Sequence, residues 1–151
     1  MKFSGDSSVK CLLATAAFGA LLLSNSSGAT ELTVTVSDIK SDVGALNITL
    51  YNNPDDWLSD RVFATKQLRI SESMVEGIIT TSFEVEPGEY AVSVHHDNND
   101  NGKMDTNFIG IPKEPLGLSN GAVPKYGPPK YKDAVFSVGA DGASMPIKLL
   151  D

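Results

Sequence analysis

The sequence predicts an all-β domain, a single antiparallel Greek-key sandwich of about seven strands. Apolar and polar residues alternate with a period of two in several short stretches, as expected for strands with one face against a core. Turn-forming residues separate these stretches at 42–44, 52–54, 87–88 and 139–142. Short strands spaced by such turns are typical of antiparallel sandwiches.

The predicted strands follow one another along the chain. The inward-facing residues of the first two are Leu32, Val34 and Val36, then Leu46, Ile48 and Leu50. Residues 62–70 form a weaker third strand, and 60–70 is also the only stretch that could supply a helix. The later inward sets are Ile79, Thr81, Phe83 and Val85, then Tyr90, Val92 and Val94, then Ala134, Phe136 and Val138, with Ile147 and Leu149 last.

A long connection separates the strand that ends at Asp97 from the one that begins near Asp133. It holds an Asn/Asp cluster followed by five prolines, Pro112, Pro115, Pro124, Pro128 and Pro129. Connections of this length without regular structure are unusual inside a compact domain and are generally functional or disordered. We therefore expect this connection to be either functional or disordered.

The N-terminus predicts a signal peptide at residues 1–29. Lys2 and Lys10 supply positive charge ahead of an apolar run at 11–23. Small residues at 27–29 then favour cleavage after Ala29. The apolar run is shorter than the ~20 residues that a membrane-spanning helix needs. We expect a protein exported to the periplasm or the medium, with a β-sandwich domain at 30–151 and no transmembrane span after cleavage. A retained anchor is the alternative.

The composition bears on how the mature domain is stabilised and on which partners it could bind. Cleavage would remove Cys11, the only cysteine, so the mature domain would depend on packing, and on any bound metal, instead of disulfides. The chain has 19 acidic and 12 basic residues and a net charge of −7. Nucleic-acid binding needs clustered Lys and Arg, so we expect no nucleic-acid partner.

The most informative motif is the run H-H-D-N-N-D-N-G-K-M-D at residues 95–105. Its polar residues match relative positions of a calcium loop, namely Asp97 (1), Asn99 (3), Asn101 (5), Gly102 (6) and Asp105 (9). Side-chain oxygens at alternate positions can converge on one hard cation, the carbonyl of Lys103 can add another ligand, and glycine permits the sharp turn. The motif therefore predicts a possible Ca²⁺ site.

The calcium-like motif departs from an EF-hand at its closing position. In an EF-hand, position 12 of the loop supplies a bidentate carboxylate. In this chain that position is occupied by Phe108. Glu114 is the candidate for the missing carboxylate. We expect a weak site, with a Kd of about 10⁻⁴–10⁻³ M as in extracellular modules. The alternative is an Asx-rich turn that satisfies its own backbone amides and binds no ion.

Two histidines precede the loop. Neighbouring residues on a strand point to opposite faces, so His95 and His96 cannot easily hold one ion together. His96 shares the apolar face of its strand, and we expect its ring to bond a nearby loop carbonyl or Asp. We expect His95 to point to solvent. The chain has no third histidine, so we do not expect zinc.

The segment G-L-S-N-G at 117–121 matches the nucleophile-elbow pattern G-x-S-x-G. No predicted strand precedes it, no helix follows it, and both histidines come before Ser119, so the context is wrong for that motif. We interpret it as a glycine-rich turn and expect no enzymatic activity. A hydrolase built on His96, Asp97 and Ser119 is the less favoured alternative.

A second functional hypothesis comes from the aromatic residues. Tyr51, Trp57, Tyr126 and Tyr131 could form a sugar-stacking surface, which would make the protein a carbohydrate-binding or cell-envelope-binding module. Aromatic residues at strand ends more often close the end of a core. The sequence does not identify the ligand or partner.

The segment 90–120 resembles a mostly bacterial, exported family known as domain of unknown function 2141. The family hallmark is similar to H-D-x-N-x-N-G-x-x-D-x-N-x-x-G-x-P-x-E-x-x-G-x-S-N. It is matched here by His96, Asp97, Asn99, Asn101, Gly102, Asp105, Asn107, Gly110, Pro112, Glu114, Gly117, Ser119 and Asn120. A G-P-P-x-[FY]-x-x-A stretch continues the match at 127–134.

The resemblance implies a prealbumin-like sandwich and no assigned activity. Pro115 departs from the family pattern, which has a glycine or small residue after the glutamate, and this stiffens the segment that must bring Glu114 to the loop. We therefore expect an exported β-sandwich protein that acts as a non-enzymatic binding or structural module, with a weak calcium-type loop at 97–105.

Overall fold

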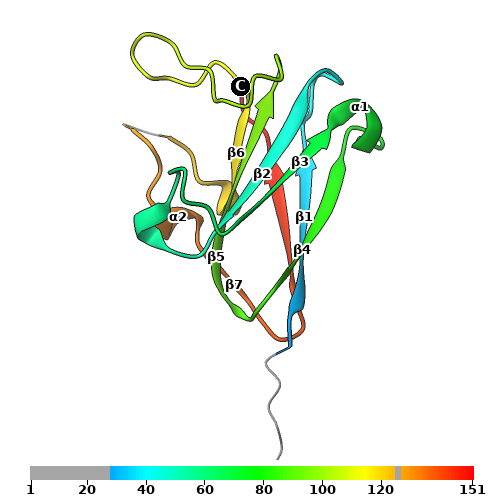
Figure 1. The fold of residues 1–151 in the computed structure, drawn as a ribbon, viewed down its shortest axis with the longest axis vertical. Coiled ribbons are helices and arrows are strands. Elements are labelled where there is room, and N and C mark those ends of the chain that lie inside the picture. Colours follow the sequence, from blue (N-terminus) through cyan, green and yellow to red (C-terminus); the bar gives the residue numbers. More distant parts are fainter. Residues whose placement is uncertain (1–27, 125–126) are drawn as a thin grey trace, which may run out of the picture.

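The computed structural model describes residues 28–124 and 127–151 (Figure 1). The predicted signal peptide lies almost entirely outside these residues, and so does Tyr126. Within the described ranges, no helix is long and apolar enough to cross a membrane.

Eight strands form two sheets that pack face to face (Figure 1). The three-stranded sheet has the order β4 (Ile79–Val85), β1 (Thr30–Ser37), β8 (Ala143–Lys148). The larger sheet has the order β3 (Ala64–Arg69), β2 (Ala45–Tyr51), β5 (Gly88–Asp97), β6 (Leu116–Leu118), and β7 (Phe136–Val138) pairs with the start of β5. Four short helical turns lie between strands, η1 (Pro54–Asp56), α1 (Ile70–Ser73), η2 (Ser119–Gly121) and α2 (Tyr131–Ala134).

The predicted all-β class is confirmed, but the seven-stranded antiparallel Greek-key sandwich is wrong. The described residues form eight strands, and β1 pairs with β8 in parallel, with Leu32 opposite Ala143. The missed strand is β6, which is only three residues long and lies inside the long connection. Residues 64–69 form a strand and not a helix. The prealbumin-like topology stays a prediction.

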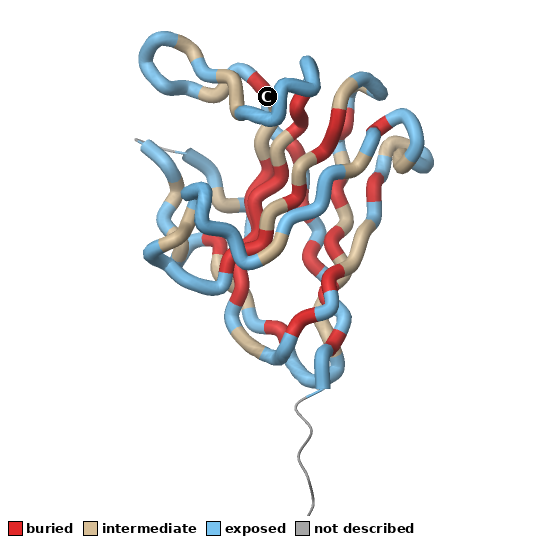
Figure 2. Tube along the Cα trace, in the orientation of Figure 1, coloured by how far each residue is buried: buried red, intermediate tan, exposed pale blue. Residues whose placement is uncertain are grey.

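The core lies between the two sheets and consists largely of the inward residues that the alternation predicted. Figure 2 shows the buried stretches along the strands and the exposed loops around them. The fully buried aliphatic side chains include Leu32, Val34, Val36, Leu46, Ile48, Leu50, Ile79, Val92 and Val94. Burying a side chain of this size contributes about 1.5–3 kcal/mol, so this core is the main source of stability in a domain without disulfides.

The two sheets are joined along one side by β6. The backbone amides of Leu116 and Leu150 each donate to the other residue's carbonyl, at 2.9 and 3.0 Å. Gly117 makes this approach possible, because a Cβ there would lie 2.6 Å from Cγ2 of Ile147. The pairing of Leu116 with Leu150 fixes the end of the long connection beside β5. Residues 98–115 therefore return toward the outer face of the larger sheet.

Candidate functional site

The calcium-like loop begins where β5 ends. Asp97, the last residue of the strand, is fully buried. Its two carboxylate oxygens accept the backbone amides of Asn101 at 3.1 Å and Gly102 at 2.7 Å. Gly102 has a φ of 76°, in the left-handed region that favours glycine. The loop therefore turns around the carboxylate of Asp97.

The other predicted ligands of the loop are linked to one another by hydrogen bonds. The amide nitrogens of Asn99 and Asn101 donate to the two carboxylate oxygens of Asp105, at 2.7 and 3.3 Å. The side-chain oxygen of Asn99 accepts the amide of Asn101, and that of Asn101 accepts the amide of Lys103, at 3.2 and 2.8 Å. The structure thus brings Asp97, Asn99, Asn101, Lys103 and Asp105 together. The side-chain oxygens of Asp97, Asn99 and Asn101 accept backbone amides, and those of Asp105 accept the two Asn side chains.

Glu114 returns to the loop despite the stiffness of Pro115. Its side chain is buried, and its Oε1 accepts the amide of Asn98 at 2.9 Å. Its Oε2 accepts the amide of Asp105 at 3.0 Å. The carboxylate therefore connects the beginning and the end of the 97–105 loop. Whether Glu114 is a metal ligand stays a prediction.

The two histidines take different roles. His96 is buried, and its Nε2 donates to the carbonyl of Val43 at 2.9 Å, as predicted for a histidine bonded to a loop carbonyl. The prediction for His95 is wrong. Its side chain is 13% exposed, and its Nε2 lies 2.8 Å from Oε2 of Glu114. The pairing of β5 with β6 places His95 opposite Leu116, two residues from Glu114, and this long-range register left no signal in the sequence.

Ser119 has a structural role in this fold. It is fully buried, and its Oγ accepts the amide of Val92 at 2.9 Å and donates to the carbonyl of Ala134 at 2.6 Å. Asn120 adds a hydrogen bond of 2.7 Å to the carbonyl of Val135. The hydroxyl that a hydrolase would need as nucleophile therefore connects β5 to α2, while His96 is bonded to Val43.

The aromatic residues form an edge-to-face cluster. The rings of Tyr51 and Trp57 are 5.1 Å apart at 77°, and those of Trp57 and Tyr131 are 5.8 Å apart at 78°. The indole nitrogen of Trp57 donates to the carbonyl of Pro129 at 2.8 Å. Burial raises the pKa values of Tyr51 and Tyr131. Rings perpendicular to one another do not present the single plane that a stacking platform requires.

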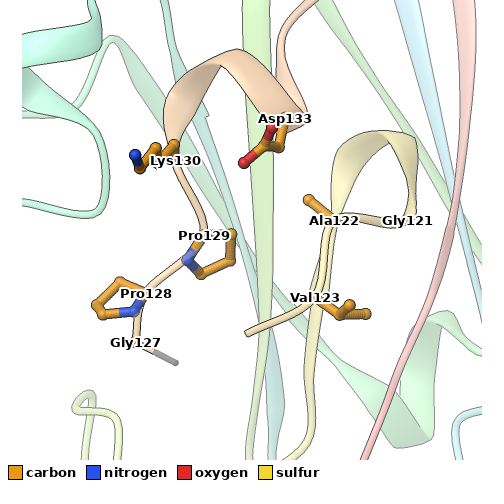
Figure 3. A pocket seen from close by; sticks show the side chains of 8 residues that line it. All are labelled: Gly121, Ala122, Val123, Gly127, Pro128, Pro129, Lys130 and Asp133. Atoms are coloured by element: carbon orange, nitrogen blue, oxygen red, sulfur yellow. The ribbon is translucent and has the colours of Figure 1, made fainter. Parts of the chain in front are cut away.

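A pocket lies beside η2 and α2. Figure 3 shows Ala122 and Val123 on one side of it, Pro128, Pro129 and Lys130 on the other, and Asp133 on the α2 turn above it. It has a volume of about 460 Å³.

The donor set of the loop differs from that of a transition-metal centre. Among residues 28–124 and 127–151, no group of three or more His, Cys, Asp or Glu side chains is arranged to hold a metal ion. The 97–105 loop instead offers two carboxylates, two amides and a backbone carbonyl, which are the oxygen ligands that calcium takes.

Comparison with protein-family models places residues 34–146 in DUF2141, described as an uncharacterized protein conserved in bacteria. No curated protein and no solved structure matched the chain. The matched segment covers well over half of the 151 residues and includes the hallmark at 96–120. This confirms the resemblance, and the chain belongs to the DUF2141 family.

Proposed function

We propose that this chain is an exported, non-enzymatic binding or structural module whose 97–105 loop takes a calcium ion with weak affinity. The ion would fix the long connection over the outer face of the larger sheet. The observation that supports this proposal is the position of Asn101. Its backbone amide bonds Asp97 and its side chain bonds Asp105, so one residue bridges two carboxylates.

The electrostatics of the loop favour a cation. Two carboxylates held near one residue repel each other, and the repulsion grows where burial lowers the local dielectric. Each oxygen of Asp97 and Asp105 accepts one hydrogen bond from the loop. A carboxylate oxygen has a second lone pair, so these bonds and a metal contact are compatible.

Calcium binding would require one rearrangement. The amide nitrogens of Asn99 and Asn101 face Asp105, so both side chains must turn their oxygens toward the ion. Glu114 is already engaged by two backbone amides and by His95, so it would supply a further oxygen to the ion only if one of these contacts changes. With two carboxylates as ligands, we expect a Kd of about 10⁻⁴–10⁻³ M.

A calcium titration followed by backbone amide NMR tests the proposal. The amides of Asn101, Gly102 and Lys103 report on the rearrangement directly, and their resonances should move in a saturable way. Magnesium provides the control, because it prefers a rigid octahedral shell and keeps several waters. Unchanged resonances at millimolar calcium would refute the ion site. Export is tested by sequencing the mature N-terminus, which should begin at Thr30.

A further inference from the structure

We propose that the turn at residues 107–111 is a membrane-contact site, which inserts its apolar side chains into the surface of a phospholipid bilayer. Phe108 is 98% exposed, the highest value among the large hydrophobic residues of the described ranges, and Ile109 and Ile111 are 65% and 54% exposed. Figure 1 shows this part of the chain as the yellow-green loop that projects from the sandwich at the upper left. The inference goes beyond the calcium proposal and does not depend on it.

The turn is held by its own hydrogen bonds. The amide of Asn107 donates to the carbonyl of Ile111 at 2.8 Å, and the amide of Gly110 donates to the carbonyl of Asn107 at 3.0 Å. The side-chain oxygen of Asn107 accepts the amides of Ile109 and Ile111, both at 3.0 Å. Four of the five backbone amides of 107–111 therefore have partners inside the turn.

This arrangement suits an apolar environment. Water is scarce below the headgroups of a bilayer, so backbone groups that enter this region need partners from their own chain. The turn leaves few amides to be desolvated at a cost, while three large apolar side chains gain free energy by leaving water. Contiguous exposed apolar residues of this kind mark sites of protein or membrane interaction.

The size and shape of the turn favour a bilayer over a protein partner. A stable protein–protein interface buries about 800 Å² and involves roughly 20–30 residues on each side. The projecting turn offers only the short segment 107–111. A bilayer surface has no such requirement, because it closes around a convex tip and each side chain contributes according to its own apolar area.

Two lysines at the base of the turn fit the phosphate groups of lipid headgroups. The amide of Lys113 donates to the carbonyl of Asp105 at 2.8 Å, which places Lys113 just below the apolar tip. Lys103 and Lys113 are both exposed, and neither forms an ion pair within the described ranges. The nearby acids are engaged, since Asp100 pairs with Arg69 and Asp105 accepts two Asn side chains. Lysine side chains can reach from an apolar contact to the headgroup level.

The test is co-sedimentation of the exported chain with phosphatidylcholine vesicles in the presence of chelator. We expect saturable binding. The chelator separates this inference from the calcium proposal, whose failure would appear as unmoved amide resonances at 101–103. In the Phe108→Trp variant, the emission added by the new indole should shift to shorter wavelength with vesicles, because that side chain leaves water.

Serine variants locate the contact. Phe108→Ser should weaken vesicle binding about ten-fold or more, the value of burying an aromatic side chain. Val62→Ser is the matched control, because Val62 is an apolar residue outside the turn, 42% exposed, and binding should not change. The inference is overturned if the unmodified chain does not bind vesicles, or if Phe108→Ser binds as tightly. It is also overturned if the chain is a dimer that Phe108→Ser dissociates, since a second copy would then cover the turn.

Discussion

His95 and Glu114 form a nearly buried hydrogen-bonded pair, with 2.8 Å between Nε2 and Oε2 and side-chain exposures of 13% and 5%. The same carboxylate accepts the amides of Asn98 and Asp105. One side chain thus holds both ends of the 97–105 loop against β5. This contact explains how a long connection keeps a defined conformation.

The first prediction concerns this carboxylate. Glu114→Gln should lower the free energy of unfolding by about 2 kcal/mol. The substitution replaces a carboxylate by a neutral amide, and the new side-chain NH₂ group would face the backbone N–H of Asn98 or Asp105, so that one of these amides loses its acceptor. Denaturant unfolding measures the change. Glu84→Gln, an exposed residue of β4, is the control and should change stability by less than about 0.5 kcal/mol. Equal effects of the two variants would show that Glu114 does not support the loop.

Ser119 provides the second prediction. Ser119→Ala should cost about 1–3 kcal/mol, because the buried amide of Val92 and the carbonyl of Ala134 lose their partner. Ser137→Ala, on the exposed face of β7, should have little effect. Thermal or denaturant unfolding compares the two variants. A Ser119→Ala protein of unchanged stability would reopen a catalytic role for the hydroxyl.

Gly117 provides the third prediction, on the joint between the sheets. Gly117→Ala should destabilise the fold by about 1–3 kcal/mol, because its Cβ would lie 2.6 Å from Ile147 Cγ2 and 2.8 Å from the carbonyl oxygen of Lys148. Gly139→Ala is the matched control, since nothing lies within 4 Å of a Cβ there. The prediction fails if both variants unfold at the same denaturant concentration.

Alkaline unfolding gives the fourth prediction. Burial raises the pKa of Tyr51 above the ordinary value of 10.0, so the folded state holds the phenol proton more tightly than the unfolded state. This contribution to stability is complete below about pH 10 and is lost as the pH rises toward the folded pKa. Denaturant unfolding at a series of alkaline pH values should show the decline. In Tyr51→Phe it should be shallower, and an identical decline in both proteins would contradict the assignment.

Alternation predicted the core strands because a strand's side-chain period is a local property. Leu32, Val34 and Val36 are buried as expected. β6 has no such signal, since it is three residues long with Gly117 at its centre, and it exists because distant β5 and Leu150 pair with it. The parallel pairing of β1 with β8 is also non-local and could not be read from either strand.

The 97–105 loop was also predictable only where its contacts are local in sequence. Motif spacing located Asp97, Asn99, Asn101 and Asp105 in one turn, because residues so close in sequence cannot move far apart. The partner of His95 depends on the register between β5 and β6, and so it was missed.

Calorimetric unfolding in calcium and in chelator tests the central claim most directly. At calcium about ten times above Kd, binding to the folded state alone adds ~1.4 kcal/mol, which raises Tm by several degrees. Asp105→Asn should remove this increase. Asp100→Asn, which changes the same charge in the same loop at a residue paired with Arg69, should retain it. A Tm that is equal in calcium and chelator, or an increase that survives in Asp105→Asn, would contradict a calcium site in the 97–105 loop.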